Sequence, residues 1–297
     1  MELWTDSFLE YLHSERNDSL KTVEAYAKDL SEFQEFLEEQ VPDASWAAIT
    51  ADDVREWVIF LLDEQKMSAA SVNRKLSALR TFYRYLRRMG WVSINPMEKV
   101  VAPKKKRPLP YFVRESEMDR LLEITAEDKT FKGIRDRLVL MMFYETGVRR
   151  AELLSMTDAS VDLVAKQVKV TGKRNKQRIV PFGEELEKEI REYLSARQET
   201  LGENVFPALF VNENGTAVNE SQVAKIVRDN LSKVTTIKRR SPHVLRHSFA
   251  TAMLNNNADL TSIQKLLGHE SVATTEIYTH VSFEELKSEY KSAHPRK

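Results

Sequence analysis

The sequence predicts a mainly α-helical protein that consists of an N-terminal helical bundle and a C-terminal, mostly α-helical domain with a small β-sheet or hairpin. Three observations predict this fold class. Apolar residues recur at helical spacing through residues 1–90, and no strand pattern interrupts them. Prolines and basic residues are then concentrated in residues 95–110. In the C-terminal part, two short β-prone segments flank the polar turn TGKRNKQ, which indicates a hairpin.

Apolar spacing and capping residues mark the helices of the N-terminal part. Ser19 is a candidate N-cap. The helix after it carries apolar residues at spacings of four, three and four: Tyr26, Leu30, Phe33 and Leu37. Thr50 and Asp53 have the spacing of a capping box and open the next helix. A further helix over residues 71–90 has an apolar face and a basic face. We expect the basic face to hold Arg74, Lys75, Arg80, Arg84, Arg87 and Arg88.

Residues 95–110 contain four prolines and four consecutive basic residues. Because proline blocks regular structure and stiffens a connection, this composition predicts a boundary between two domains. We expect a helical domain at residues 1–90, a linker at 91–110 and a second domain at 111–297.

The second domain alternates between helical and β-prone segments. Its expected helices cover residues 116–125, 131–146, 184–200, 219–233, 242–255 and 259–268. Its expected strands cover residues 165–170 and 178–182, on either side of the polar turn.

Charge is balanced over the whole chain but uneven along it. The 45 basic and 45 acidic residues cancel, yet residues 1–64 carry 17 acids and 4 bases. Residues 65–114 carry 1 acid and 13 bases, and residues 225–246 carry 1 acid and 7 bases. Residues 165–182 carry 6 bases and no acid. Such basic stripes can form a focused positive channel for nucleic acid, although solvated helix faces would give the same pattern.

Several classes of protein are excluded by composition. The chain has no cysteine, which excludes disulfides, Cys-ligated zinc, iron–sulfur clusters and thiol nucleophiles. No apolar run approaches the roughly 18 residues of a membrane span. The N-terminus lacks the basic region and the cleavage site of a secretion signal. We therefore expect a cytoplasmic protein without a membrane segment.

The stretch SPHVLRHSFA places several candidate site residues on one helix. His243 and His247 have the spacing of a zinc helix, but Val244 stands where a zinc protease carries its glutamate. Arg246 lies one helical turn from His243, and its planar guanidinium matches phosphate or carboxylate. The spacing therefore favours an anion site made by His243 and Arg246, without a metal. We expect His247 to pack in a structural role.

Four other residues would complete a phosphate site if the fold brings them together. Arg149 stands at an expected helix start, where backbone N–H groups already favour anions. Lys173 lies in the turn of the predicted hairpin, where a flexible ammonium can donate a proton. His269 directly follows a helix, and Tyr278 is a candidate nucleophile. Each would be an ordinary surface or packing residue in isolation.

The chain resembles the tyrosine recombinases of the phage integrase family, of the XerC and XerD type. The resemblance lies in the order of these residues and in four phrases: TGVRRAELL, GKRNKQRIVPFG, HVLRHSFATAML and LLGHESVATTEIYTHV. The N-terminal bundle is similar to the family's core-binding domain, which binds DNA. The second domain, residues 111–297, is similar to the catalytic domain, with a C-terminal tail that docks on a partner protomer.

The resemblance implies a site-specific recombinase that cuts and rejoins DNA. It implies that Tyr278 attacks a DNA phosphate and forms a 3′-phosphotyrosyl link, which leaves a free 5′-hydroxyl. Arg149 and Arg246 would clamp the non-bridging oxygens, where negative charge gathers without need of a metal. Lys173 would protonate the leaving 5′-oxygen.

Two histidines complete the implied catalytic set. His243 would assist proton transfer at the nucleophile, and His269 would donate a further hydrogen bond to the phosphate. Three positions depart from the usual family pattern: Arg150, Arg174 and Ala252. None of them removes a catalytic group, so they bear only on the subgroup.

The resemblance also implies partners and a role. The partners would be a double-stranded DNA recombination site, a second Xer-type recombinase in a tetramer on two DNA sites, and a septal DNA translocase. The role would be the resolution of chromosome dimers, with no metal and no other cofactor. In the first domain we expect Arg74 and Arg80 to contact DNA, because they lie on the polar face of their helix.

Four alternatives stay open at this point. An integrase of a phage or transposon shares every catalytic residue. A type IB topoisomerase uses similar chemistry without exchanging partners. A DNA-binding protein with an inactive site, and a metallohydrolase built on His243 and His247, are the other two.

Overall fold

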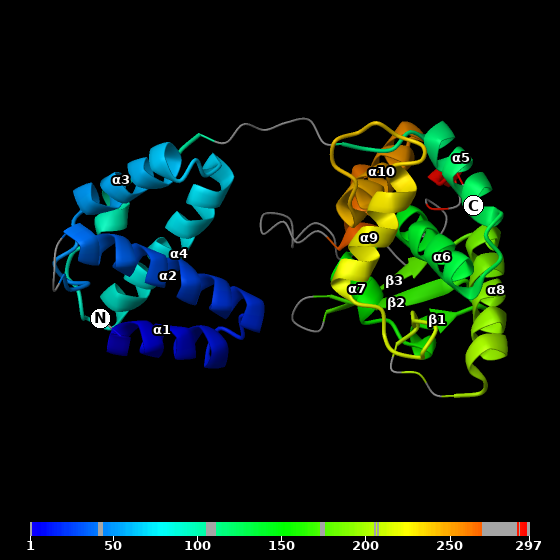
Figure 1. The fold of residues 1–297 in the computed structure, drawn as a ribbon, viewed down its shortest axis with the longest axis horizontal. Helices are drawn as coiled ribbons and strands as arrows, with labels where there is room; N and C mark the ends of the chain where they lie inside the picture. The colour runs from blue at the N-terminus through cyan, green and yellow to red at the C-terminus, as the bar shows by residue number, and fades with distance from the viewer. Residues whose placement is uncertain are drawn as a thin grey trace. The chain divides into compact units, whose positions relative to one another are not determined.

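The computed structural model describes residues 2–40, 44–104, 111–172, 176–204, 206, 208–268, 290 and 292–295. The chain forms two compact units, Met1–Pro108 and Leu109–Lys297, which are described here separately (Figure 1). Within the described ranges there are eleven α-helices and one three-stranded sheet. The predicted fold class, mainly α-helical with a small β-hairpin, is therefore confirmed.

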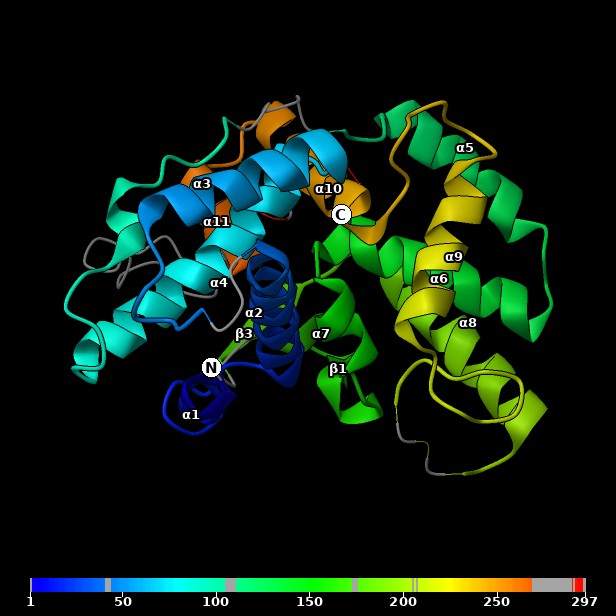
Figure 2. The same ribbon diagram turned by 60° about the vertical axis from the view of Figure 1, so that its left-hand side comes forward.

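The first unit is a helical bundle. Its elements are α1 (Glu2–Ser14), α2 (Leu20–Gln40), α3 (Ala51–Ile59), the π-helical turn η1 (Phe60–Glu64), α4 (Ala69–Arg88) and the 3-10 turn η2 (Pro96–Lys99). Helix α4 packs against α1 and α2 (Figure 1 and Figure 2). Its predicted apolar face is buried, and Leu76, Leu79 and Phe82 have no exposed surface. Thr50 and Asp53 form the predicted capping box at the start of α3.

Lys75 does not lie on the basic face of α4, where we expected it. Its side chain is buried, and its ammonium binds Asp29 at 3.1 Å and also binds Glu32. A buried ammonium is tolerated when carboxylates pair with it, and α2 supplies both of these carboxylates. The helical spacing correctly predicted the apolar face, but it did not reveal this buried ion pair.

The chain after α4 continues along the same bundle. Val92, Met97 and Val100 belong to its apolar core, and η2 contacts α3 and α4. Part of the segment that we assigned to a linker, residues 91–110, thus packs on the first unit. The reason is that its apolar side chains bury against the neighbouring helices.

The second unit is built around α6 (Phe131–Thr146), which is buried along most of its length. The other helices of this unit are α5 (Glu115–Ala126), α7 (Arg150–Leu154), α8 (Glu184–Leu201), α9 (Glu220–Leu231), α10 (Pro242–Asn255) and α11 (Leu260–Leu267). Helices α5, α8, α9 and α10 all contact α6 (Figure 1). Each helix predicted for this unit is present within two residues at either end.

A small antiparallel sheet has the strand order β1 (Val161–Asp162), β2 (Gln167–Thr171) and β3 (Gln177–Pro181). Strands β2 and β3 form the predicted hairpin, in which Val168 pairs with Val180. The short 3-10 turn η3 (Asp158–Ser160) leads into β1, which was not predicted because two residues carry no alternating pattern. Strand β2 contacts α7 and β3 contacts α11, so the hairpin is fixed between these two helices.

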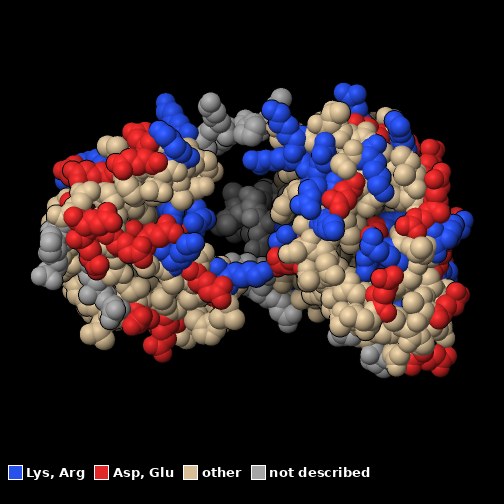
Figure 3. Space-filling view, in the orientation of Figure 1, with Lys and Arg blue, Asp and Glu red and all other residues tan. Residues whose placement is uncertain are grey.

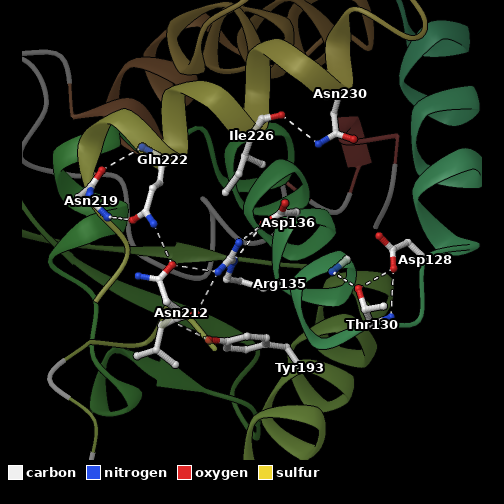
Figure 4. Close-up of polar contacts among 12 residues, drawn as sticks. Asp128, Thr130, Arg135, Asp136, Tyr193, Asn212, Asn219, Gln222, Ile226 and Asn230 are labelled. Atoms are coloured by element: carbon white, nitrogen blue, oxygen red, sulfur yellow. Dashed lines mark hydrogen bonds and ion pairs between the residues drawn. The ribbon is translucent and has the colours of Figure 1, made fainter. Parts of the chain in front are cut away.

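A partly buried polar network connects α9 to α6 (Figure 4). Arg135 of α6 pairs with Asp136 at 2.7 Å and donates to the Asn212 side-chain oxygen at 3.2 Å. Gln222 of α9 donates to the same oxygen at 3.0 Å and also closes the capping box with Asn219. Because the network joins α6, α9 and the loop that precedes α9, it fixes the start of α9 on the central helix.

The described residues near the C-terminus pack into the second unit. Tyr290 and His294 are buried, and their rings stack with centroids 4.9 Å apart. His294 also lies against Tyr144 and Phe249, on α6 and α10. Docking of the tail on a neighbouring protomer stays a prediction; in this chain the described tail residues lie in its own core. Across the described ranges, no helix is long and apolar enough to cross a membrane.

Candidate active site

Three of the six predicted catalytic residues lie in the described part of the chain. Arg149 precedes α7, and His243 and Arg246 lie on α10, so the fold joins segments far apart in the sequence. The other three lie outside the described residues: Lys173, His269 and Tyr278.

The turn between α6 and α7 determines where Arg149 lies. Gly147 ends α6 in the left-handed conformation, with φ of 60°. A Cβ atom at this position would lie 2.6 Å from Phe249 Cδ1 and 2.8 Å from Leu267 Cδ2. Both the conformation and the close packing therefore require glycine. The turn places Arg149 at the N-cap of α7.

Glu152 of α7 binds Arg149 twice. Its Oε2 atom accepts the main-chain N–H of Arg149 at 2.7 Å, and its Oε1 atom accepts from Arg149 Nη1 at 2.7 Å. The first bond is the carboxylate half of a capping box. The Glu152 side chain is 3% exposed, so the carboxylate is shielded from water.

Strand β3 supplies a second guanidinium to the same carboxylate. Arg178 Nη1 donates to Glu152 Oε1 at 2.7 Å, and Arg178 Nη2 donates to Oε2 at 2.8 Å. This bidentate pair is the strong and directional form of the arginine–carboxylate contact. Arg178 Nε donates at 2.7 Å to the carbonyl oxygen of Leu266, in the last turn of α11.

Arg246 projects from α10 into the same cluster and is 6% exposed. Its Nη1 atom donates to the carbonyl oxygen of Gly147, and its Nη2 atom donates to that of Leu267 at 2.5 Å. The guanidinium is thus held by the ends of two different helices, α6 and α11.

The end of α11 joins three guanidinium groups, which we call the arginine cluster. The consecutive carbonyl oxygens of residues 266, 267 and 268 each accept from one member, in the order Arg178, Arg246 and Arg149. Carbonyl groups at a helix C-terminus carry partial negative charge and attract cations. Gly268 caps α11 in the left-handed conformation, with φ of 61°. The segment that leads directly to His269 is therefore anchored on the arginine cluster.

The arginine cluster holds more positive than negative charge. Burial alone would raise the pKa of Glu152, but hydrogen bonds from Arg178 and Arg149 lower it to about 2. Burial, and then the charges of Arg149 and Arg178, lower the pKa of Arg246 to about 10. At neutral pH the cluster thus contains three cations and one carboxylate, so it attracts anions.

Two histidines and a further arginine surround the cluster on α10 and α7. Partial burial, and then the charges of Arg246 and Arg150, lower the pKa of His243, so its imidazole is neutral at neutral pH. Arg150 pairs with Glu220 at 2.8 Å. Both His247 and His243 keep part of their side chains at the surface. Our prediction that His247 packs was wrong, because residues four apart on α10 share its outer face.

The zinc-helix interpretation of His243 and His247 finds no third ligand in the part of the chain that the structure describes. Within those residues, no three histidine, aspartate or glutamate side chains gather in a group that could hold a metal ion. The carboxylate in the cluster, Glu152, is bound by two arginines instead.

The two arginines that we expected to contact DNA in the first unit also make internal contacts. Arg74 donates to both carboxylate oxygens of the buried Asp29, at 2.5 and 2.8 Å, and its side chain stays 50% exposed. Arg80 donates to the carbonyl oxygen of Val100 at 3.1 Å. Asp29 thus orients the guanidinium of Arg74 while leaving part of it at the surface.

Charge on the surface follows the stripes seen in the sequence. Lys and Arg side chains gather over the part of the second unit where α9 and α10 lie (Figure 3). Asp and Glu side chains gather over α2 and α3 of the first unit in the same view. Residues 225–246, which belong to α9, α10 and the loop between them, carry 7 bases and 1 acid.

Sequence reasoning missed two members of the site, Glu152 and Arg178. Glu152 stands three residues after Arg149, which is the capping-box spacing. Thr50 can accept the N–H of the third helical residue, whereas Arg149 has no side-chain acceptor, so only the acidic half of the signal was present here. Arg178 had no comparable signal, because its role depends on how β3 lies against α7 and α11.

Comparisons with known proteins show the family to which the chain is similar. The profile of the phage integrase family matches residues 111–285, and that of the phage integrase N-terminal SAM-like domain matches residues 5–90. The tyrosine recombinase XerC of Staphylococcus haemolyticus is 39% identical over 98% of this chain and 96% of its own length. XerC of Listeria monocytogenes (serotype 4a) is 40% identical over 97% of this chain and 96% of its own length.

Solved structures of recombinases have a similar fold. The XerA recombinase is 30% identical, with a TM-score of 0.50 over 99% of each chain. The XerH site-specific recombinase bound to its difH substrate is 24% identical, with a TM-score of 0.69 over 96% of this chain and 82% of that chain. At this identity the second likeness concerns the fold alone.

Proposed function

The chain belongs to the phage integrase family, and from this premise we propose that it is a tyrosine recombinase that cuts and rejoins DNA at a specific site. The observation that carries the proposal is the pair Arg149 and Arg246. Both guanidinium groups bind carbonyl oxygens at the end of α11, within a cluster of excess positive charge. A guanidinium has five N–H donors, and each of these two uses two of them in the contacts described above. The remaining donors suit the non-bridging oxygens of a phosphodiester.

The proposed reaction is a transfer of the phosphoryl group to tyrosine. The Oη atom of Tyr278 attacks the phosphorus, and the bond from phosphorus to the 5′-oxygen breaks. The tyrosine proton passes to His243, whose lowered pKa leaves it neutral and able to accept. Lys173 protonates the departing 5′-oxygen, and His269 donates a further hydrogen bond to the phosphate. Charge that builds up on the phosphate is stabilised by guanidinium groups already in place.

The covalent product explains how the strand is rejoined. The 3′-phosphotyrosyl ester keeps the energy of the broken phosphodiester, so attack by a 5′-hydroxyl restores DNA and frees the tyrosine without ATP. Attack by a 5′-hydroxyl from another duplex gives recombination, whereas attack by the original 5′-hydroxyl restores the starting strand. Two DNA sites held by four protomers allow the exchange.

We further propose a role in the resolution of chromosome dimers, in the cytoplasm, together with a second Xer-type recombinase. The support is the match to XerC proteins along nearly the whole of both chains. Control by a septal DNA translocase belongs to the same proposal. In it, the first unit binds DNA and the second performs the chemistry.

Covalent adduct formation tests the proposal. The protein is incubated with a nicked duplex that carries the site it selects from a random-sequence pool, because a nick lets the cleaved end diffuse away. We expect a protein–DNA adduct in the presence of EDTA, and no adduct with Tyr278→Phe. Loss of the adduct in EDTA would contradict the phosphate clamp. Mapping of bound sites on the source genome separates one chromosomal site from the ends of a mobile element.

A further inference from the structure

We propose that Arg178 is a positioning residue for the cleavage reaction: it occupies Glu152 so that Arg149 stays available to the phosphate, and it fixes the end of α11. The inference rests on the proposed function, because DNA cleavage is its readout. Arg178 itself does not contact the phosphate in this account.

The carboxylate of Glu152 is fully used. An ionised carboxylate offers about four lone-pair positions. Arg178 fills two of them through Nη1 and Nη2. Arg149 fills the other two, one through its main-chain N–H and one through Nη1. Arg149 therefore binds the carboxylate with one guanidinium nitrogen only, and the rest of its fork remains directed elsewhere.

Removal of Arg178 would leave two positions of a buried carboxylate empty. Glu152 is 3% exposed, so water cannot replace the lost bonds without a rearrangement. Arg149 is the cation that remains bound to it, and a bidentate pair is the strongest contact these two groups can make. The carboxylate would then close on the guanidinium of Arg149 and remove donors from the phosphate.

Arg178 also holds the backbone that precedes His269. Its Nε atom binds the carbonyl oxygen of Leu266, and its side chain lies directly against Gly268. A Cβ atom built at Gly268 would lie 3.2 Å from Arg178 Nη1 and 3.3 Å from Arg178 Cδ. The Arg178 side chain thus holds both the Glu152 carboxylate and the C-terminal end of α11 in place.

The contacts of Arg178 show why it positions other groups and does not bind substrate. All three of its guanidinium nitrogens donate to the protein, and its side chain is 14% exposed. Arg149, in contrast, is 37% exposed. The two arginines share one carboxylate, but Arg149 alone presents a substantial surface to solvent.

The second unit contains a matched control, Arg197. It binds both carboxylate oxygens of Asp158, at 2.9 and 2.6 Å, and the carbonyl oxygen of Leu209 at 3.1 Å. Arg197 thus binds the same kinds of group as Arg178, one carboxylate and one main-chain carbonyl, at a place outside the arginine cluster. Arg197→Met therefore removes the same kind of structural contact without touching the site.

The test compares Arg178→Met with Arg197→Met. Urea unfolding gives the folded fraction, and single-turnover adduct formation at saturating nicked duplex gives the rate per folded molecule. A misplacement of about 1 Å at a reacting group costs roughly 100-fold in rate, and we expect that loss for Arg178→Met with little change in DNA affinity. Arg197→Met should keep the wild-type rate per folded molecule. Equal rates for the two variants would overturn the inference.

Two further variants separate positioning from a general need for charge. Arg178→Lys keeps the charge but cannot make a bidentate pair and bind α11 at once, so it should stay well below the wild-type rate. Full rescue by lysine would contradict the inference. The double variant Arg178→Met with Glu152→Gln should cleave faster than Arg178→Met alone, since the amide carries no charge to close on Arg149.

A double variant whose loss equals the product of the two single losses would also contradict the inference, because independent sites behave in that way. Normal cleavage by the wild type and by Arg178→Met would overturn the role of Arg178 and leave the proposed function intact. Absence of any adduct with the wild type would overturn the proposed function and the role of Arg178 together.

Discussion

The turn at Gly147 is tightly packed, and Gly147→Ala gives a quantitative test of that packing. An alanine in the left-handed conformation costs about 1–2 kcal/mol. Its methyl group would lie 2.6 Å from Phe249 Cδ1 and 2.8 Å from Leu267 Cδ2, and such overpacking costs a further ~1–3 kcal/mol. We expect the free energy of unfolding of the second unit to fall by about 2–5 kcal/mol in total.

Gly215→Ala is the matched control in the same unit. Gly215 also has a positive φ, of 78°, but the nearest atom to a new Cβ there is Phe206 Cε1 at 3.4 Å. This variant should therefore show the backbone cost alone, about 1–2 kcal/mol. Urea unfolding of both variants isolates the packing cost at Gly147. Equal destabilisation of the two would refute the packing argument.

The same substitution should also disturb the site. The carbonyl oxygen of Gly147 accepts a hydrogen bond from Arg246, so a shift of this turn moves one guanidinium of the proposed clamp. Adduct formation per folded molecule should fall for Gly147→Ala and not for Gly215→Ala. A loss of activity that only followed the folded fraction would show that the turn does not set the position of Arg246.

Three further predictions follow from individual contacts. The pKa of Glu152, about 2, lies below its ordinary 4.5, so the ionised carboxylate contributes about 3 kcal/mol of stability. This contribution is present above pH 4.5 and is lost as the pH falls towards 2. Glu152→Gln should therefore flatten the acid side of a curve of unfolding free energy against pH, measured with urea, and an unchanged slope would contradict this. Lys75→Met leaves Asp29 and Glu32 without their buried ammonium and should lower the free energy of unfolding of the first unit by about 3 kcal/mol. An unchanged free energy of unfolding would show that Arg74 alone satisfies Asp29. Replacement of Arg74 and Arg80 by alanine should weaken DNA binding and reduce its salt dependence, measured by titration at several salt concentrations; unchanged binding would remove both from the interface.

The fold was largely predictable from the sequence because its signals are local. Helical spacing and caps gave the helices of the second unit, and the capping box at Thr50 formed as predicted. The hairpin followed from β-prone residues around a polar turn. What the sequence did not reveal depends on contacts between distant elements: the burial of Lys75 against α2, and the packing of Met97 and Val100 on the bundle.

The site divides in the same way. The sequence and the family resemblance predicted catalytic roles for Arg149, His243 and Arg246, and these roles stay predictions. The fold places Arg149 and Arg246 against the ends of α6 and α11, and His243 lies on α10 one turn from Arg246. Arg178 could not be found in advance, since its role depends on β3 lying against α11. The prediction for His247 failed in another way: we expected a packed structural residue, but the side chain lies at an exposed position on α10.

The central claim is that Arg149 and Arg246 clamp the reacting phosphate, and the most direct measurement compares binding with cleavage. Arg149→Ala and Arg246→Ala are each titrated with the selected duplex and then assayed for adduct formation at saturating DNA. The account predicts that each variant loses roughly 100-fold to 1,000-fold in cleavage, the cost of removing one fixed donor from a charged transition state, while its Kd for DNA changes little. Equal losses in binding and cleavage would contradict the account and make both residues ordinary anchors for the DNA backbone.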